Sequence, residues 1–229
     1  MIFSVMQPYI FPYLGYYQLV NAVDKFVFYD DVTFIKSGYI NRNSILSNGL
    51  AQRFTIPVPG MSSNILINEL KFDSNVKKIL KAIQQSYSKA PFFNQVYPLV
   101  EGVLMCKNRS IEHICALSIK MVFEYLEIDK EILFSSNIQY DRTLPAPDKL
   151  IAIAKALGGD KYINTPGGKS LYSKDYFAGK NVHLSFIETE HYKYTQNNNE
   201  FIPHLSMIDV LMWNEKDAVK ELLNKYRLD

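Results

Sequence analysis

Polar and aromatic side chains of the kinds that do chemistry gather in four short segments of this chain. The segments are QPYIFPYLG at 7–15, DDVTFIKSGYINR at 30–42, TPGGK at 165–169 and ETEHYKYTQ at 188–196. Each begins where a short apolar run, typical of a buried β-strand, comes to an end. Ligands of open parallel α/β sheets bind at the carboxyl ends of the strands. We therefore expect the four segments to meet at one cleft.

Groups able to move a proton occur in two of these segments. His191 lies in a polar stretch just past a predicted strand, and imidazole is a natural general base near neutral pH. Tyr194 and Gln196 are close enough along the chain to share its surroundings. Asp30 and Asp31 end another strand, where a carboxylate can hold a metal ion or a ribose hydroxyl or act as a base. Neighbouring side chains on an extended chain point opposite ways, so one of the two aspartates should face the cleft.

The first segment supplies binding groups but no acid, base or nucleophile of ordinary reactivity. Gln7 follows the first predicted strand, and its amide either hydrogen-bonds a ligand or caps the loop. Tyr9 and Tyr13 each stack on a ligand ring or pack beneath the loop. We expect this loop to hold the substrate, while proton transfer comes from the neighbouring strand ends.

Basic and amide side chains in the second segment are candidates for binding an anion. Lys36 and Arg42 could contact phosphate, arginine through paired donors and lysine as a point charge. The alternative for both cations is ordinary solvated surface. Asn41 and Asn43 alternate with Arg42 and could share one face of an extended chain.

The glycine pair of the third segment is a further candidate for an anion site. Backbone N–H groups of Gly167 and Gly168 can approach a phosphate closely, and Lys169 adds a positive charge. A plain glycine turn is the alternative, because the spacing of a Walker A motif is missing. His204 and Asp209 lie five positions apart, a poor spacing for a shared helix face, so no dyad is implied there. No HExxH, GxSxG or CxxC motif occurs, and we expect no metal site.

The elements that must position these residues alternate between strand and helix patterns. Extended apolar runs occur at 2–6, 25–29, 65–72, 131–135, 161–164 and 182–187. Helical spacing occurs at 16–23, 75–88, 92–105, 111–126, 147–157, 203–213 and 215–225. Asn48-Gly49 is a hairpin turn signal. The pattern predicts one α/β domain over 1–229, with a mainly parallel, twisted, Rossmann-like sheet, helices on both faces and a β-hairpin insertion near 45–72.

Bulk composition narrows the function classes. The 229 residues carry a net charge of +2, which does not suggest a nucleic-acid binder. No run of 18 apolar residues and no basic segment before the first apolar run occur, so we expect a cytoplasmic protein without a membrane span. The 16 tyrosines suit stacking on sugars or bases, or else a large aromatic core.

The residues carry a pattern that resembles the WbqC-like protein family. Its N-terminal part is MQPYIFPYLGYYQLVNAVDKFVFYDDVTFIKSGYINRN at 6–43. The pieces KLIAIAKALGGDKYINTPGGKSLY, HYKYTQ and FIPHLSMIDVLMWN follow in the same order. The resemblance implies a bacterial protein of O-antigen (lipopolysaccharide) or other surface polysaccharide biosynthesis, which transfers glycine or a similar acyl group onto an amino sugar. A second resemblance, to nucleotidyltransferases and other HUP-like folds, rests on the order strand, proline-rich turn, helix and VDKFVFYDD, but their HxGH is replaced by YLGYYQL.

The resemblance leads us to expect an N-acyl or aminoacyl transferase that modifies the amine of a nucleotide-linked amino sugar. The acyl donor would be a thioester of coenzyme A or of an acyl-carrier protein, with no tightly bound cofactor. His191 is then the preferred base, with Asp30 or Asp31 as the alternative. The glycine pair and the basic residues named above would hold phosphates. Two alternatives remain, a nucleotidyltransferase that uses a nucleoside triphosphate with Mg²⁺ and a non-catalytic module that binds a sugar nucleotide or carrier protein.

Overall fold

The computed structural model describes residues 1–190, 193–197 and 200–229. A six-stranded sheet in the order β5-β2-β1-β6-β7-β8 runs through the molecule. Its strands are β1 (Ile2–Met6), β2 (Lys25–Phe28), β5 (Glu131–Phe134), β6 (Lys161–Asn164), β7 (His183–Thr189) and β8 (Tyr226–Leu228). All neighbouring strands are parallel except β7 and β8. The predicted mainly parallel sheet is therefore confirmed.

The order of the strands places a topological switch point beside β1. From β1 the chain builds outward through β2 to β5, then crosses back to β6 on the other side of β1 and continues to β7. Loops that leave β1 and β6 at their carboxyl ends therefore diverge, and ligands of such sheets commonly bind at this position. The segments 7–15 and 165–169 leave the sheet at this switch point.

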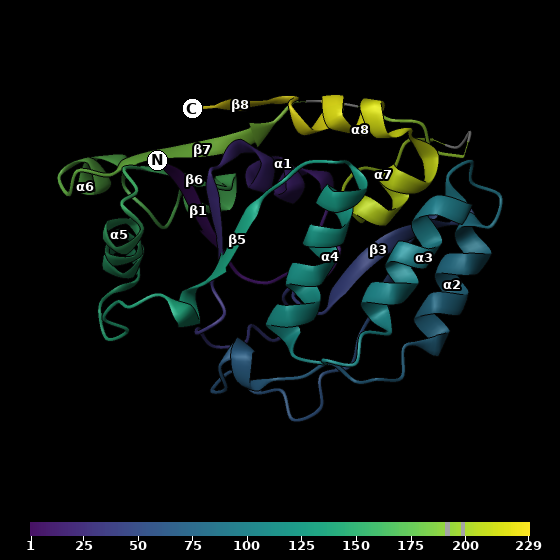
Figure 1. Cartoon of the computed structure of the whole chain (residues 1–229), viewed down its shortest axis with the longest axis horizontal. Helices are drawn as coiled ribbons and strands as arrows, with labels where there is room; N and C mark the ends of the chain where they lie inside the picture. The colour runs from purple at the N-terminus through teal and green to yellow at the C-terminus, as the bar shows by residue number, and fades with distance from the viewer. Residues whose placement is uncertain (191–192, 198–199) are drawn as a thin grey trace.

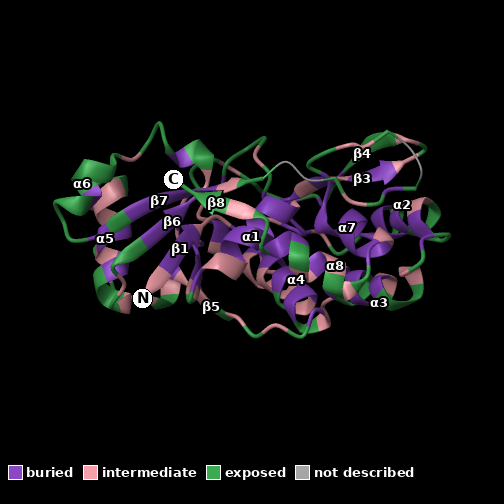
Figure 2. Cartoon of the chain, turned by 90° about the horizontal axis from the view of Figure 1, so that it is seen from above, coloured by how far each residue is buried: buried purple, intermediate pink, exposed green. Residues whose placement is uncertain are grey.

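Helices cover both faces of the sheet, as predicted (Figure 1). One face packs Phe3 and Val5 against α5 (Ala146–Leu157) and α6 (Lys174–Ala178). The opposite face buries Phe26 and Phe28 with a larger group, which comprises α1 (Leu14–Ala22), α2 (Lys77–Tyr87), α3 (Phe93–Leu104), α4 (Ile111–Tyr125), α7 (Met207–Trp213) and α8 (Lys216–Leu223). Successive side chains of a strand point to opposite faces, so both cores are needed to cover the central strands, which Figure 2 shows as buried.

The predicted β-hairpin forms a separate two-stranded sheet of β3 (Arg42–Ser47) and β4 (Leu50–Thr55). Asn48 and Gly49 connect the strands with φ angles of 49° and 77°, the left-handed pair that a two-residue turn requires. Ile45 and Phe54 lie on the same face of the hairpin and are buried in the larger core. The other face carries Arg42, Ser44 and Arg53, beside the buried Leu46.

The predicted strand at 65–72 is wrong. The segment contains a 3₁₀ turn, η1 (Ile67–Glu69), and only single β-bridges on either side of it. Ile67 and Leu70 are both buried, and a spacing of three suits a turn rather than a strand. The Glu69 carboxylate accepts a hydrogen bond from the Leu66 N–H at 3.2 Å, which stabilises that turn.

Two other boundaries differ from the sequence prediction. The helix predicted over 203–213 begins only at Met207, because Ser206 caps it by accepting a hydrogen bond from the Ile208 N–H. The chain beyond α8 forms β8, an antiparallel edge strand that the sequence did not indicate. In the described part of the chain, no helix combines the length and the apolar character needed to cross a bilayer.

Candidate functional site

The loop after β1 is held in a strained and well-anchored conformation. Phe11 is completely buried and has a φ angle of 39°, a region that non-glycine residues rarely adopt. Its N–H donates to Ser118 Oγ at 3.2 Å, and the Tyr16 hydroxyl donates to the Gln7 carbonyl oxygen at 2.7 Å. Surrounding contacts must impose this conformation, since strain of this kind persists only where the structure over-determines it.

Three segments that are distant in sequence meet at this loop. The Phe11 carbonyl oxygen accepts hydrogen bonds from the Asn43 side-chain amide and from Ser206 Oγ, the latter at 2.7 Å. The Ser206 N–H donates to the Ser44 carbonyl oxygen at 2.8 Å, and Tyr13 pairs with Ser206 in an isolated β-bridge. The first loop, the hairpin and the chain that enters α7 therefore form one rigid junction.

A hollow of about 400 Å³ opens at this junction, and we call it the arginine hollow. Its lining residues are Tyr9, Tyr13, Tyr39, Arg42, Asn43, Ser44, Ala51, Arg53, Pro203, His204 and Leu205. Arg53 lies opposite Ser44 in the hairpin register, and Arg42 lies opposite Thr55, so both arginines project from the same face of the hairpin. No aspartate or glutamate is among these lining residues.

The charges of the arginine hollow are uncompensated within the described part of the chain. Neither Arg42 nor Arg53 has an ion pair there, and the buried Nε of Arg42 has no hydrogen-bond partner there. The Arg42 guanidinium lies 5.8 Å from the ring centroid of Tyr39. Burial raises the pKa of Tyr9 well above its usual range, which the two nearby arginines only partly oppose. Tyr9 therefore stays a neutral phenol beside two cations, an arrangement suited to an anion with an aromatic or sugar ring.

A second hollow, of about 590 Å³, adjoins the first at the carboxyl end of β7. Its lining residues are Tyr13, Thr189, Glu190, Lys193, Phe201, Pro203 and His204. We call it the β7 hollow. Tyr13, Pro203 and His204 line both hollows and so form the wall between them. The two hollows are therefore neighbouring compartments with three residues in common.

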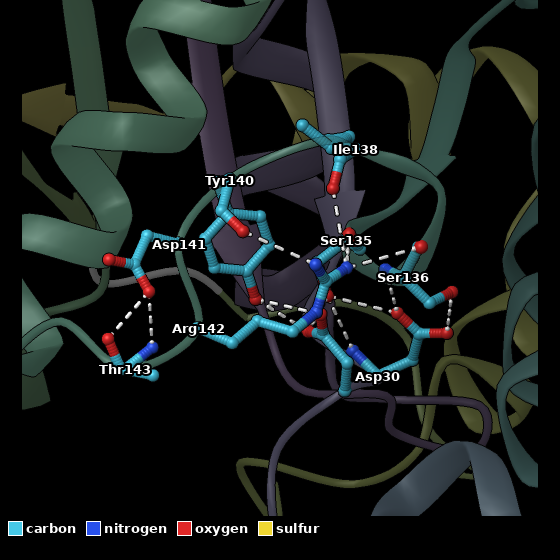
Figure 3. Close-up of polar contacts among 9 residues, drawn as sticks. Asp30, Ser135, Ser136, Ile138, Tyr140, Asp141, Arg142 and Thr143 are labelled. Carbon is cyan, nitrogen blue, oxygen red and sulfur yellow. Dashed lines mark hydrogen bonds and ion pairs between the residues drawn. The ribbon is translucent and has the colours of Figure 1, made fainter.

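The two predicted aspartates lie elsewhere, in a network that ties β2 to the chain after β5 (Figure 3). Asp30 is 1% exposed, and its carboxylate accepts hydrogen bonds from Ser135 Oγ at 3.0 Å, the Ser136 N–H at 2.9 Å and Ser136 Oγ at 2.6 Å. Asp31 accepts from Ser135 Oγ and pairs with Arg142 Nε at 2.7 Å. Neither carboxylate lines the arginine hollow or the β7 hollow.

Arg142 connects Asp31 to three backbone carbonyl groups after β5. Its Nη2 donates to the carbonyl oxygens of Ser135, Ser136 and Ile138 at 3.3 Å each, and its guanidinium stacks 4.6 Å from the Tyr140 ring centroid. The Tyr140 hydroxyl donates to both oxygens of Asp31 at 2.8 Å. The occupied oxygens of Asp30 and Asp31 indicate a structural function in this conformation.

The glycine turn after β6 is also tied into the fold. Gly168 is so close to Asn164 that a Cβ at that position would lie 2.6 Å from Asn164 Nδ2, whereas Gly167 faces open space. Lys169 Nζ pairs with Glu188 at 2.7 Å and with Asp229 at 2.5 Å. Lys169 is therefore engaged by acids rather than left to bind an anion.

Two of the predicted amide side chains donate hydrogen bonds to backbone carbonyl oxygens. Asn41 Nδ2 donates to the Ile56 carbonyl oxygen at 2.8 Å, and Asn43 holds the Phe11 carbonyl as described above. Gln7 is half-buried after β1, and Lys36 is exposed; neither lines the two hollows.

Tyr194 and Gln196 both bind the carboxylate of Asp209, which was not among the predicted site residues. Both donate to Asp209 Oδ2, at 2.8 Å and 3.0 Å, and Tyr87 donates to Oδ1 at 2.8 Å. Burial raises the pKa of Asp209, although these hydrogen bonds oppose the shift. The Tyr194 ring packs edge-on against Phe201 at 5.1 Å and so supports the wall of the β7 hollow.

The structure thus brings together only part of the predicted site. Tyr9, Tyr13, Arg42 and Asn43 line the arginine hollow. His191, the preferred base, lies outside the described residues. Sequence reasoning missed Tyr39, Arg53 and His204 as lining residues; the alternation of Arg53 with Ala51 on the second hairpin strand was the available signal for one of them. No three His, Cys, Asp or Glu side chains of the described chain gather as a metal site.

The chain is a Rossmann-like α/β protein whose candidate site is a hollow lined by arginine and tyrosine side chains. The chain belongs to the WbqC-like protein family, which matches residues 7–221. It is also similar to a protein of Mycobacterium tuberculosis (strain ATCC 25618 / H37Rv) named "Uncharacterized protein Rv1507c", with 22% identity over 213 residues that cover 91% of each chain. No solved structure matches.

Proposed function

We propose that this protein transfers an acyl or aminoacyl group to the amino nitrogen of a nucleotide-linked amino sugar in the biosynthesis of bacterial surface polysaccharide. Membership of the WbqC-like protein family supports the link to polysaccharide. The observation that carries the proposal is the arginine hollow, where Arg42 and Arg53 stand beside three tyrosines with no acid among the lining residues.

A sugar nucleotide has the chemistry that this hollow would recognise. Its diphosphate carries negative charge, and guanidinium groups bind phosphate oxygens in pairs. Its base and sugar present flat or ring-shaped surfaces, against which Tyr9, Tyr13 and Tyr39 can pack. The volume of about 400 Å³ is in the range of ordinary small-molecule sites, roughly 300–1,000 Å³.

The β7 hollow would take the second substrate, an acyl thioester. The sugar amine then attacks the thioester carbonyl where the two hollows adjoin, beside their shared residues Tyr13, Pro203 and His204. Such a reaction requires alignment of the two reactants, removal of a proton from the amine and donors for the developing oxyanion. Burial raises the pKa of Tyr13, so its phenol keeps its proton and can act as one such donor.

Mass spectrometry of the product tests the proposal. The protein is incubated with a dTDP-linked amino sugar and with acetyl-CoA, glycyl-CoA or an acyl-carrier thioester. The expected result is a sugar nucleotide heavier by the acyl group, with release of free thiol in equal amount. Binding of the sugar nucleotide without product from any donor would instead favour the non-catalytic binding module.

A nucleotidyltransferase is the second candidate, because the switch point between β1 and β6 is the position where nucleotides bind in sheets of this kind. ATP or CTP with Mg²⁺ would then raise the melting temperature, since a ligand that binds only the native state stabilises it. Release of pyrophosphate in the presence of a sugar phosphate would favour this function over acyl transfer.

A further inference from the structure

We propose that His204 carries the proton in this transfer, from a position where it faces both substrates. The inference rests on the proposed function and adds the residue that accepts the proton of the amine. His204 belongs to the wall shared by the arginine hollow and the β7 hollow. Its ring lies edge-on to Tyr13, with 6.0 Å between the ring centroids. Ligands that fill the two hollows therefore meet beside its imidazole.

The backbone around His204 is built to hold the side chain at this wall. Its φ angle is 60°, in the left-handed region that residues with a Cβ seldom occupy. Leu205 and Ser206 follow directly and are buried, and Ser206 is anchored to Phe11 and Ser44 by the hydrogen bonds of the junction. Conformations of this kind collect at functional sites, where neighbouring contacts enforce them.

The imidazole of His204 is available for chemistry. It is exposed, and with the other residues that the structure describes it forms no hydrogen bond or ion pair. Asp209, by contrast, is fully buried beneath three hydrogen-bond donors, and Asp30 is equally enclosed. The titratable and charged groups that share its two hollows are Tyr9, Tyr13, Tyr39, Arg42, Arg53, Glu190 and Lys193.

We assign to His204 both the removal of the amine proton and its delivery to the leaving thiolate. The amine nitrogen of the sugar forms a bond to the carbonyl carbon of the thioester, and a free ring nitrogen of His204 takes one N–H proton. The carbon–sulfur bond then breaks, and the thiolate leaves with the electron pair of that bond. The imidazolium returns its proton to the thiolate, so that an amide and a free thiol result and His204 is regenerated.

Chemical rescue tests the proton transfer. We expect His204→Ala to lower kcat by roughly 10²–10⁴-fold, the usual contribution of a general base, and added imidazole to restore part of the rate. His183→Ala is the matched control, because His183 is exposed at the start of β7 and lines neither hollow. Full activity in His204→Ala would overturn the inference, and so would a loss confined to His191→Ala.

A second measurement does not depend on turnover. Diethyl pyrocarbonate modifies accessible imidazoles, and peptide mass spectrometry reports each histidine separately. We expect dTDP alone and acetyl-CoA alone each to slow modification of His204 and to leave His183 unchanged. Protection by neither ligand overturns the placement of His204 between two substrates. Protection by both without any acylated product overturns the transferase and still supports that placement.

Discussion

Ser206 Oγ donates a hydrogen bond to the carbonyl oxygen of Phe11 at 2.7 Å, joining residues that are 195 positions apart in the chain. Phe11 lies in the loop after the first strand, and Ser206 caps α7 directly after the wall of the two hollows. The contact therefore joins the loop of the candidate site to the start of α7.

Replacing Ser206 with alanine should remove this contact and the cap of α7 together. We expect the free energy of unfolding to fall by about 1–3 kcal/mol, because a buried acceptor and a helix terminus lose one partner. Urea denaturation measures the change. Ser74→Ala is the control, since Ser74 is exposed and caps no α-helix, and it should change stability by less than about 0.5 kcal/mol. Equal losses of unfolding free energy in Ser206→Ala and Ser74→Ala would show that the Ser206 hydrogen bonds do not stabilise the fold.

Replacing Arg53 with glutamine should weaken binding of dTDP about 10- to 100-fold, since hydrogen bonds to a charged group contribute about 1.5–3 kcal/mol. Arg53 lines the arginine hollow without an ion pair in the described part of the chain, whereas the exposed Lys36 does not line it. Lys36→Gln changes net charge equally and should leave the affinity almost unchanged. Isothermal titration calorimetry at fixed ionic strength measures the dTDP affinity of both variants. Identical losses of affinity would show that dTDP responds only to net charge and makes no direct contact with Arg53.

Replacing Arg142 with alanine should destabilise the fold by about 1–3 kcal/mol while leaving ligand affinity intact. The nearly buried Asp31 carboxylate loses a charged partner, although Arg142 itself is 45% exposed and solvent screens part of the loss. Lys25→Ala breaks the more exposed pair with Glu131, at 3.4 Å, and should cost less than about 1 kcal/mol. A loss of dTDP affinity in Arg142→Ala would place the aspartate network in the binding site after all.

The glycine pair after β6 provides an internally matched comparison. Gly168→Ala would place a methyl group 2.6 Å from Asn164 Nδ2 and should destabilise by about 1–3 kcal/mol, because a packed interior resists added volume. Gly167→Ala meets no atom within 4 Å and should change the free energy of unfolding by less than about 1 kcal/mol. The midpoint of thermal unfolding reports both. A larger loss of stability in Gly167→Ala than in Gly168→Ala would contradict the close packing of Gly168 against Asn164.

The ion pairs of Asp229 with Lys169 and Lys174 lower the pKa of its carboxyl from 3.8 to about 2. A carboxyl with a lowered folded pKa contributes stability above its unfolded pKa, and that contribution disappears as pH falls through the folded value. Asp229→Asn should therefore be less stable than the parent at pH 6, by about 1 kcal/mol or less at this exposed site. Denaturation between pH 6 and pH 2 should show the difference shrink, and a constant difference would count against the ion pairs.

The sequence by itself determined the fold class and many of the elements. Apolar runs at β1 and β2, helical spacing around α4 and the Asn48-Gly49 turn are local patterns, and each formed where the spacing of apolar side chains or the turn chemistry required it. The strand predicted over 65–72 is wrong because Ile67 and Leu70 are buried by residues distant in sequence. A local sequence pattern does not contain that information. Tyr9, Tyr13 and Arg42, predicted as site residues from their types and from their place after predicted strands, line the arginine hollow.

Only the tertiary structure decided which polar residues line the two hollows. Asp30 and Arg142 are far apart in the chain, but both form hydrogen bonds with Ser135. The carboxylate of Asp30, a predicted base, is therefore occupied within a structural network. His204 and Arg53 line the arginine hollow because the hairpin folds back over the first loop, where Asn43 and Ser206 bind the same Phe11 carbonyl. Residue type sets what a side chain can do, but packing between distant segments sets which partners satisfy it and which groups remain free.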